Sequence, residues 1–424
     1  MRCDIAVIGA GPAGLAAASA AAGRSVVVVD LAAWPGGQYY RHPADAQPAR
    51  AFARLRSGAR ILGNHRVFAI EAGPPHVVHM SGDVRELRAD AVVIATGAYD
   101  RQVPFPGWEL PGVVTVGGAQ ALVKGSRVLP GKRIVVAGTG PFLLPVAAGL
   151  AGHVVAVFDA GSPAGFARFP GVLARHPGKI VEAAGYLATL ARHRVPLRTR
   201  HTVVAAHGTD ELDAVTVTSP DGSQRIDCDT LAVGYGFTPR IDLGLALGCA
   251  TREIAGGIVL DVDDRQATSV PDVFAAGEVT GVGGAALALV TGTLAGRAMA
   301  QMLPTRRLLR ARARHAEFAA TMNQVWPTPD TWLDGLTDDT IICRCEEIRY
   351  AAVRAAVTDL GARDARAVKL LTRTGMGWCQ GRICGEPVAC VVARLTGTPQ
   401  NATDRRILAQ PVTLGELATT EEDG

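Results

Sequence analysis

Residues 3–14 read Cys3-Asp4-Ile5-Ala6-Val7-Ile8-Gly9-Ala10-Gly11-Pro12-Ala13-Gly14, a short apolar run that ends in the pattern G-x-G-x-x-G. This spacing directly after a strand is typical of a dinucleotide-binding site. Gly9 permits a tight turn, Gly11 lets the backbone approach a pyrophosphate, and Gly14 lets the next helix pack closely on the strand. The helix then directs its free N–H groups and its positive dipole end at the phosphate.

The residues that follow complete the unit. Residues 15–22 are alanine-rich and predict a helix that Gly23 ends, and residues 25–29 predict a buried strand. Asp30 closes that strand about twenty residues beyond the fingerprint, where a carboxylate can accept hydrogen bonds from an adenosine ribose. Strand, glycine motif, helix, strand and acid therefore occur in the order that dinucleotide binding requires.

Composition limits the class of protein. The 424 residues are too many for one ordinary core, so two or three domains are expected. A hydrophobic content of 48% with 19% charged residues describes a well-buried globular protein. The net charge is +4, and no basic run is interleaved with aromatic residues, so the sequence does not indicate nucleic-acid binding.

The N-terminus and the cysteines indicate the compartment. The N-terminal apolar run has no basic region before it, and the glycine fingerprint interrupts it, so we read it as a strand and not as a signal peptide. We also expect no membrane span, because no uncharged run is long enough. We therefore expect a cytoplasmic protein without structural disulfides. Of its eight cysteines, five lie between positions 343 and 390.

Three further segments are expected to complete the first nucleotide site. The loop 34–41 brings Gly37, Gln38 and Arg41 within reach of a ligand, since adjacent glycines let the backbone approach it closely. We also expect Val67, on a strand predicted over residues 65–70, to be a cofactor-binding residue. The other candidates follow buried strands that exit into small residues, which leave room for a cofactor: Thr96, Gly97, Gly277 and Glu278.

A second nucleotide-binding unit is expected between these segments. The strand over residues 132–136 leads to Gly138-Thr139-Gly140-Pro141-Phe142-Leu143, and a later strand ends at Asp159. Leu143 stands where the third glycine would be, and its side chain would separate helix and strand or shift their register. The sequence therefore leaves the occupant open between NAD, another adenine nucleotide such as ATP, and nothing.

The C-terminal third contains the second centre. Residues 305–335 begin with an arginine-rich helical stretch and end in a proline-rich linker. Cys343 and Cys345 form a C-x-C pair, and Cys379 and Cys384 form a C-x4-C pair after thirty-three intervening residues. Four thiolates on two tight loops can hold an iron–sulfur cluster. Zinc is the main alternative, although its sites favour two to four residues between paired cysteines, and two disulfides are a weaker one.

Residues 1–304 resemble the two-dinucleotide-domain flavoproteins of the pyridine nucleotide-disulfide reductase type. The resemblance implies an α/β fold of two nested Rossmann-like domains and FAD bound at Gly9, Gly11, Gly14 and Asp30. Members of this family usually have Asp where this chain has Glu278. No Cys-x-x-Cys pair occurs in residues 1–304, so a dithiol substrate has no redox partner here.

The segment around the four cysteines is similar to the small helical 2Fe-2S domain of bacterioferritin-associated ferredoxin. The predicted boundaries are 1–110 and 246–304 for the FAD domain, 111–245 for the second nucleotide domain, 305–335 for the linker, 336–397 for the 2Fe-2S domain and 398–424 for the tail. With this domain, the Gly-Gly-Gln loop and the tail, the whole chain resembles the alpha subunits of heteromeric amino-acid dehydrogenases of the opine oxidase, proline or hydroxyproline dehydrogenase and hydrogen cyanide synthase type.

That resemblance implies an electron-transferring flavoenzyme component that acts on CH–NH donors with a partner. It implies a beta subunit of the D-amino-acid-oxidase type, FMN at the interface and a small ferredoxin-like gamma subunit. The chain itself offers no catalytic arrangement that the sequence can single out. The alternatives are a free-standing NAD(P)H-dependent reductase of a ferredoxin-like acceptor, and a scaffold or iron-delivery partner that retains FAD structurally.

Overall fold

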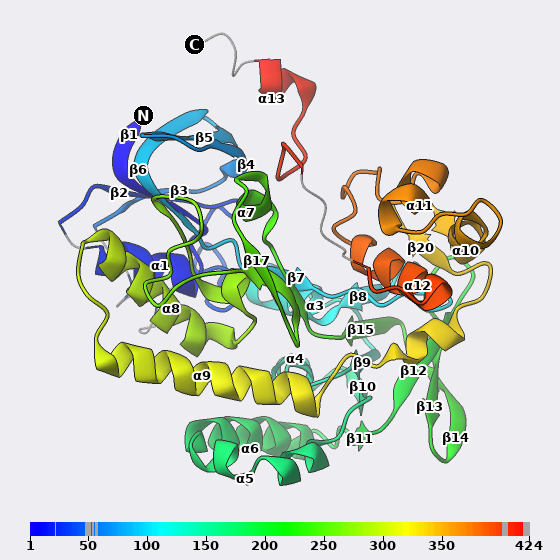
Figure 1. Ribbon diagram of the computed structural model, residues 1–424. Coiled ribbons are helices and arrows are strands. Elements are labelled where there is room, and N and C mark those ends of the chain that lie inside the picture. Colours follow the sequence, from blue (N-terminus) through cyan, green and yellow to red (C-terminus); the bar gives the residue numbers. More distant parts are fainter. Residues whose placement is uncertain (22, 47–51, 53–54, 56–57, 401–405, 419–424) are drawn as a thin grey trace.

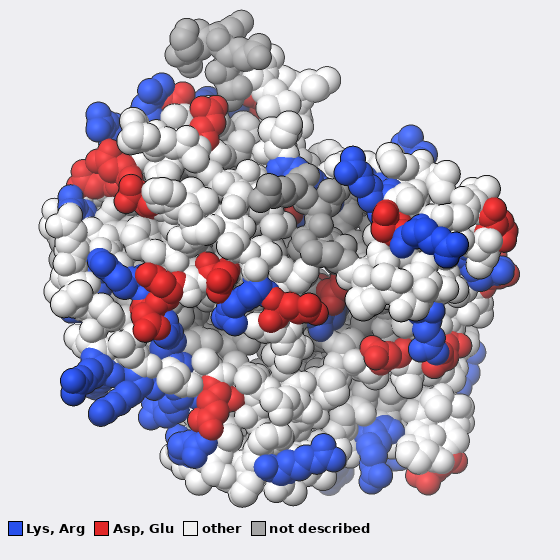
Figure 2. Space-filling view, viewed as in Figure 1, with Lys and Arg blue, Asp and Glu red and all other residues white. Residues whose placement is uncertain are grey.

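The computed structural model describes residues 1–21, 23–46, 52, 55, 58–400 and 406–418. They form two α/β units and a small, mainly helical C-terminal domain (Figure 1). This arrangement confirms the predicted fold class. Lys and Arg side chains are interspersed with Asp and Glu on the face drawn in Figure 2.

The first sheet has the strand order β3-β2-β1-β6-β5-β4, and β19 pairs with the end of β6 that β5 leaves uncovered. Strands β1, β2, β3, β6 and β19 run parallel, and β4 and β5 form an antiparallel extension. The bounds are β1 (Arg2–Ile8), β2 (Val26–Val29), β3 (Arg60–Leu62), β4 (Arg66–Glu71), β5 (His76–Ser81), β6 (Glu86–Ile94) and β19 (Val273–Ala275). Strand β2 is four consecutive valines, all buried, as expected for a parallel strand covered on both faces.

Helices α1 (Pro12–Ala20) and α8 (Gly284–Met299) pack against each other beside this sheet (Figure 1). The contact is backbone to backbone, because a Cβ on Gly292 would lie 2.1 Å from the Ala13 carbonyl oxygen. Helix α1 begins at Pro12 and not at the predicted residue 15. Proline is accepted in the first helical turn because its missing N–H would have no partner within the helix.

The second unit is a parallel sheet of order β11-β10-β9-β15-β8 with an antiparallel meander, β12-β13-β14. Its bounds are β8 (Val113–Thr115), β9 (Ile134–Gly138), β10 (Val154–Asp159), β11 (Leu197–Thr199), β12 (Thr202–His207), β13 (Ala214–Ser219), β14 (Gly222–Asp227) and β15 (Thr230–Gly234), with helices α3 (Val116–Ala121), η1 (Leu122–Ser126), α4 (Leu143–Gly149), η2 (Pro163–Arg168), α5 (Pro170–Ala174) and α6 (Pro177–Arg192).

Short elements connect the two units. Strands β7 and β16 pair with each other between them, and β17 and β18 form a hairpin before the chain returns to the first sheet. Their bounds are β7 (Ala98–Asp100), β16 (Phe237–Pro239), α7 (Asp242–Ala246), β17 (Thr251–Ile254), β18 (Gly257–Leu260) and η3 (Gly277–Thr280). Because β19 rejoins the first sheet after the second unit is complete, the second unit is inserted within the first.

Most of the predicted linker is the helix α9 (Arg306–Val325). Thr305 caps it, since its side chain accepts a hydrogen bond from the Leu308 N–H. The helix crosses the molecule between α8 and the α5/α6 pair (Figure 1) and contacts α5 through an Arg175–Glu317 ion pair. The residues after α9 lead through η4 (Asp330–Gly335) to the C-terminal domain.

The C-terminal domain has its own apolar core, which includes Val353, Val368 and Val392. Its elements are β20 (Ile341–Cys343), β21 (Ile348–Arg349), α10 (Tyr350–Thr358), α11 (Ala365–Thr372) and α12 (Gly385–Thr396), followed by α13 (Leu414–Ala418) in the tail. Trp332 and Ile383 also pack against the core of the second unit, so the domain is docked on that unit.

Candidate functional site

The first glycine fingerprint has the geometry of a phosphate loop. Gly9 has a φ of +112°, and a Cβ there would lie 2.3 Å from the Ala95 carbonyl oxygen. A Cβ on Gly14 would lie 1.8 Å from the Gly9 carbonyl oxygen, so neither position accepts a side chain. Helix α1 begins directly after Gly11, and no side chain caps its first N–H groups. These N–H groups could meet an anion, as a dinucleotide pyrophosphate would require.

Asp30 lies beside this loop at the end of β2. One carboxylate oxygen accepts a hydrogen bond from the Ala10 N–H at 2.5 Å, and the other from the Ala32 N–H at 2.7 Å. Both of these donors are backbone groups, and they fix the carboxylate next to the turn. The structure therefore brings the predicted ribose acid and the fingerprint together.

The loop containing Gly37 joins the same site. The Gly36 N–H donates to the Ala10 carbonyl oxygen at 2.8 Å, and a Cβ on Gly37 would lie only 2.8 Å from the Cα of Gly11. Gln38 and Arg41 hydrogen-bond each other, with 3.0 Å between Arg41 Nε and Gln38 Oε1. The loop thus approaches the fingerprint through backbone, as its paired glycines predict.

The segment that follows β19 also lies beside the fingerprint. Gly277 is buried, and a Cβ there would lie 2.7 Å from that of Ala13. Its N–H donates to the Thr291 hydroxyl on α8 at 2.9 Å, a contact with no local signal in the sequence. Burial raises the pKa of the half-buried Glu278, while the Gly284 N–H acts in the opposite direction.

Thr96 and Gly97 are both hydrogen-bonded to the backbone of Arg240. The Thr96 hydroxyl donates to the Arg240 carbonyl oxygen at 2.6 Å, and the Arg240 N–H donates to the Gly97 carbonyl oxygen at 2.9 Å. Sequence reasoning did not identify Arg240. Val67 lies on β4 with its side chain in the core, 5% exposed, so only its backbone could face a nucleotide.

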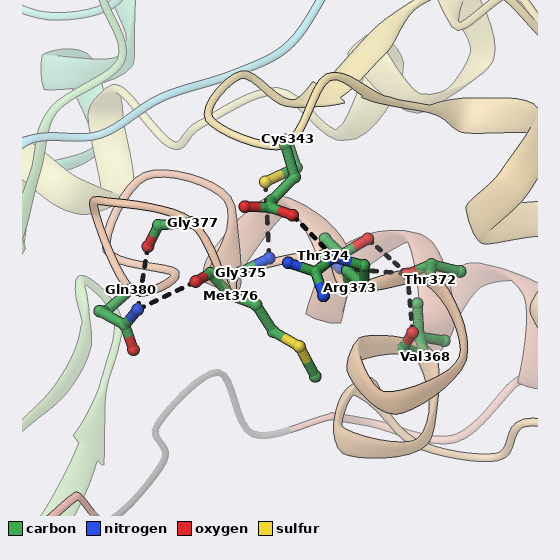
Figure 3. Close-up of polar contacts among 10 residues, drawn as sticks. Cys343, Val368, Thr372, Arg373, Thr374, Gly375, Met376, Gly377 and Gln380 are labelled. Atoms are coloured by element: carbon green, nitrogen blue, oxygen red, sulfur yellow. Dashed lines mark hydrogen bonds and ion pairs between the residues drawn. The ribbon is translucent and has the colours of Figure 1, made fainter.

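The four candidate ligand cysteines of the C-terminal domain come from the end of β20, the turn after it, the loop before α12 and the start of α12. The Gly375 N–H points at the Cys343 sulfur, 3.4 Å away (Figure 3). The nearby Cys384 thiol, which can donate its proton to either sulfur, is the main cause that lowers the pKa of Cys343 to about 6 and that of Cys379 to about 5. Cys379 in turn hydrogen-bonds Cys345. The thiols therefore form a chain of contacts in the order 343, 384, 379, 345.

These thiols differ in exposure, since Cys343 and Cys384 are buried, Cys379 is half-buried and Cys345 is exposed. A Cβ on Gly377 would lie 2.5 Å from that of Cys345, so this glycine allows the second loop to approach the first. Among the described residues, no three His, Cys, Asp or Glu side chains converge on one position where a single metal ion could sit. The donor set of four adjacent thiols fits a thiolate-bound iron–sulfur cluster.

The nearby arginines bond to other groups. Arg373 Nε lies 3.0 Å from Glu346 Oε2, and Arg382 forms an ion pair with Asp242 at 3.3 Å (Figure 3 shows Arg373). Arg344 donates to the Glu109 carbonyl oxygen and lies over the Trp108 ring. Any attraction between these cations and a cluster would therefore act at longer range and not through direct contact with the sulfurs.

Polar contacts hold the cysteine domain on the nucleotide units. The buried Trp108 donates its indole N–H to the Ile341 carbonyl oxygen at 2.6 Å, two residues before the first cysteine. Arg101 pairs with Glu386 at 2.9 Å, just after the last ligand candidate. These contacts fix the cysteine loops relative to the first 304 residues, and no pattern in the sequence indicates them.

The second fingerprint also forms a tight turn. Gly138 has a φ of +138°, and a Cβ there would lie 1.7 Å from the Gly234 carbonyl oxygen. Asp159 lies at the end of β10 and accepts the Gly140 N–H at 3.3 Å, as the pattern predicts. It also accepts the indole N–H of Trp326 at 2.9 Å, which the sequence did not indicate.

All eight cysteines are free thiols. None of the helices in the described part of the chain combines the length and the apolar character that a membrane span needs.

Comparison with known proteins agrees with this geometry. Residues 3–301 match the pyridine nucleotide-disulphide oxidoreductase family, and residues 341–394 match the BFD-like [2Fe-2S] binding domain. Hydrogen cyanide synthase subunit HcnB of Pseudomonas aeruginosa is 32% identical, over 89% of this chain and 90% of the relative. An opine oxidase subunit from Rhizobium meliloti (strain 1021) is 32% identical over 99% of both chains.

Among solved structures, L-proline dehydrogenase from P. horikoshii has a similar fold. It superposes with a TM-score of 0.72 at 20% identity, over 98% of this chain and 79% of that one. With the family matches, this confirms the predicted resemblance. The chain belongs to the pyridine nucleotide-disulphide oxidoreductase family, whose flavin oxidoreductase fold it combines with a BFD-like domain that implies a 2Fe-2S cluster.

Proposed function

We propose that this chain is the alpha, electron-transferring subunit of a heteromeric flavin-dependent dehydrogenase that acts on amino acids or secondary amines in the cytoplasm. The substrate class is that of opines, hydroxyproline or proline, in keeping with the relatives named as opine oxidase subunits and the fold neighbour L-proline dehydrogenase. The chain would pass electrons between the flavin of a beta subunit, the 2Fe-2S cluster and FAD.

One observation carries this proposal: the four-thiol site is docked on the nucleotide units of the same chain by Trp108 and Arg101. A flavin exchanges two electrons, whereas an iron–sulfur cluster exchanges one, so a chain that holds both can convert paired into single electrons. The proposed cluster ligands are Cys343, Cys345, Cys379 and Cys384, whose contacts with one another are described above.

FAD is assigned to the first fingerprint. Gly9, Gly11 and Gly14 would accept the pyrophosphate at the start of α1, and Asp30 would accept the ribose hydroxyls. Gly37, Gln38, Arg41, Thr96, Gly97, Gly277 and Glu278 would surround the rest of the cofactor, with Val67 contributing backbone. The rigid contacts of Gly36 and Gly277 with the fingerprint support this assignment.

The remaining partners follow from the family resemblance. The subunit names of the relatives imply further subunits, and we propose a beta subunit of the D-amino-acid-oxidase type that contains the substrate pocket. FMN would lie at the interface, and a further component would be a small ferredoxin-like gamma subunit. This chain would then bind no substrate itself.

The test is to purify the native complex, identify the co-purifying chains, and measure flavin reduction with a panel of opines, prolines and simple amines. We expect reduction by one of these only when the second subunit is present. The matched control is this chain alone, loaded with FAD and iron. Substrate oxidation by the isolated chain at the full rate of the complex would refute the proposal. Rapid anaerobic bleaching of the flavin by NADH would instead support a free-standing NAD(P)H-dependent reductase.

A further inference from the structure

The second nucleotide fold departs from the first at the start of its helix. Helix α1 has nine residues and begins directly after Gly11, whereas α4 has seven and begins at Leu143, three residues after Gly140. In the second loop, the Leu143 N–H donates to the Gly140 carbonyl oxygen and the Leu144 N–H to that of Pro141, at 3.3 and 3.2 Å. Two N–H groups at the start of this helix are therefore used within the turn, and Pro141 has none to offer a pyrophosphate.

The acid of the second fold is also engaged. Asp159 is 7% exposed, and its Oδ1 accepts the N–H groups of Gly140 and Gly161. Its Oδ2 accepts the indole N–H of Trp326 at 2.9 Å. Because Oδ1 already accepts two N–H groups, a ribose hydroxyl would have to bind at Oδ2, to which the indole donates. At the equivalent Asp30, both observed donors are backbone N–H groups.

The indole ring covers the rest of the loop. A Cβ on Gly161 would lie 2.2 Å from Cδ1 of Trp326, and one on Gly140 would lie 3.7 Å from the Trp326 Cβ. Phe166 packs edge-on against the indole with 5.4 Å between ring centroids. The Trp326 side chain thus lies against the glycine turn and also contacts Asp159, the acid expected to bind the ribose.

The residues after Trp326 are fixed in the same region. The Thr328 hydroxyl donates to the Tyr235 carbonyl oxygen at 3.2 Å and accepts from Arg101 at 2.8 Å. Arg101 also binds Glu386 of the cysteine domain. The second nucleotide fold is therefore in contact with the connection to that domain.

We propose that Trp326 closes the second dinucleotide site, so that NAD(H), NADP(H) and ATP do not bind there. The second nucleotide fold instead serves as a docking surface for the C-terminal domain. An adenosine ribose and the indole would compete for the same Asp159 oxygen, and the site as built does not fit the nucleotide. A pyridine nucleotide then cannot reach the flavin through this fold.

The test compares hydrogen exchange and calorimetric nucleotide binding in the full chain and in Trp326→Ala. In the parent chain, millimolar NAD⁺, NADH or ATP should leave exchange of residues 138–142 unchanged. In Trp326→Ala, exchange there should rise about tenfold or more, because the loop loses its cover and Asp159 its side-chain donor, and nucleotide should then protect the loop. Trp34→Ala removes an exposed tryptophan elsewhere and should leave this segment unchanged.

Trp326→Phe keeps an aromatic ring but loses the indole N–H and part of the ring, so it should show a smaller increase than alanine. This variant also tests the contact if the alanine variant fails to fold. Protection of residues 138–142 by nucleotide in the parent chain, lost in Asp159→Asn, would overturn the proposal. Unchanged exchange in both Trp326 variants would also overturn it. These readouts need no electron donor, so they are independent of the role proposed above.

Discussion

Replacing Gly292 by alanine tests whether the contact between α1 and α8 shapes the FAD site. The new Cβ would lie 2.1 Å from the Ala13 carbonyl oxygen, and the two next atoms, at 2.8 and 2.9 Å, are also backbone. A carbon–oxygen contact normally needs about 3.3 Å, so the helices must separate by about 1 Å. Overpacking of this kind costs about 1–3 kcal/mol, against about 1 kcal/mol gained in helix propensity.

We therefore expect Gly292→Ala to lower the free energy of unfolding by up to about 2 kcal/mol. Because Ala13 belongs to the fingerprint, the start of α1 moves as well, and we expect a Kd for FAD about tenfold higher, equivalent to about 1.4 kcal/mol. Denaturant unfolding measures the first quantity, and the recovery of flavin fluorescence on dilution measures the second.

Gly185→Ala is the matched control for this substitution. Gly185 lies in α6, is exposed, and has no neighbouring atom within 4 Å of the position that an alanine methyl group would take, so alanine there should raise stability by up to about 1 kcal/mol. If Gly292→Ala were as stable as Gly185→Ala and bound FAD as tightly as the parent chain, the helix contact would not shape the site and the reasoning would be refuted.

Three further predictions concern the cluster, the domain contact and a buried acid. Cys343→Ser should lower the iron and sulfide content by more than half, whereas Cys390→Ser, in the last helix of the domain, should leave both at the parental level. Glu386→Ala should lower the free energy of unfolding by about 1 kcal/mol, because it leaves the Arg101 side chain, which is 14% exposed, without its carboxylate partner. The control Asp339→Ala removes an exposed ion pair with Arg349 and should change the free energy of unfolding little. Burial raises the pKa of Asp100 despite hydrogen bonds from neighbouring groups, so its ionisation costs stability as pH rises. The thermal midpoint of Asp100→Asn relative to that of the parent should therefore increase as the pH rises above about 4, and a constant difference would contradict this.

The sequence predicted the local parts of the fold well because they are encoded locally. The spacing of the glycines at 9, 11 and 14 is specific to a dinucleotide-binding turn, and the four valines of β2 favour a buried strand, so the sequence predicts this βαβ unit. The same holds for the four cysteines, whose spacing is specific. The predicted domain boundaries and site residues stay predictions.

The remaining features depend on contacts between distant segments. Trp326 follows Asp159 by 167 residues, and nothing in its neighbourhood predicts a hydrogen bond to that acid. Trp108 similarly reaches Ile341, and Arg101 reaches Glu386, only after the domains have docked. The proline-rich stretch after α9 indicated a linker. The helix before that stretch packs against the second unit, however, and its arginine-rich sequence gives no sign of this contact.

The central claim is that one polypeptide holds both a flavin and a four-thiolate iron–sulfur cluster. The most direct measurement is the iron, acid-labile sulfide and FAD content of the full chain, purified without oxygen. We predict about two irons and two sulfides for each FAD, as expected for a 2Fe-2S cluster. Material that contains FAD but neither iron nor sulfide, or iron and sulfide but no flavin, would contradict the account.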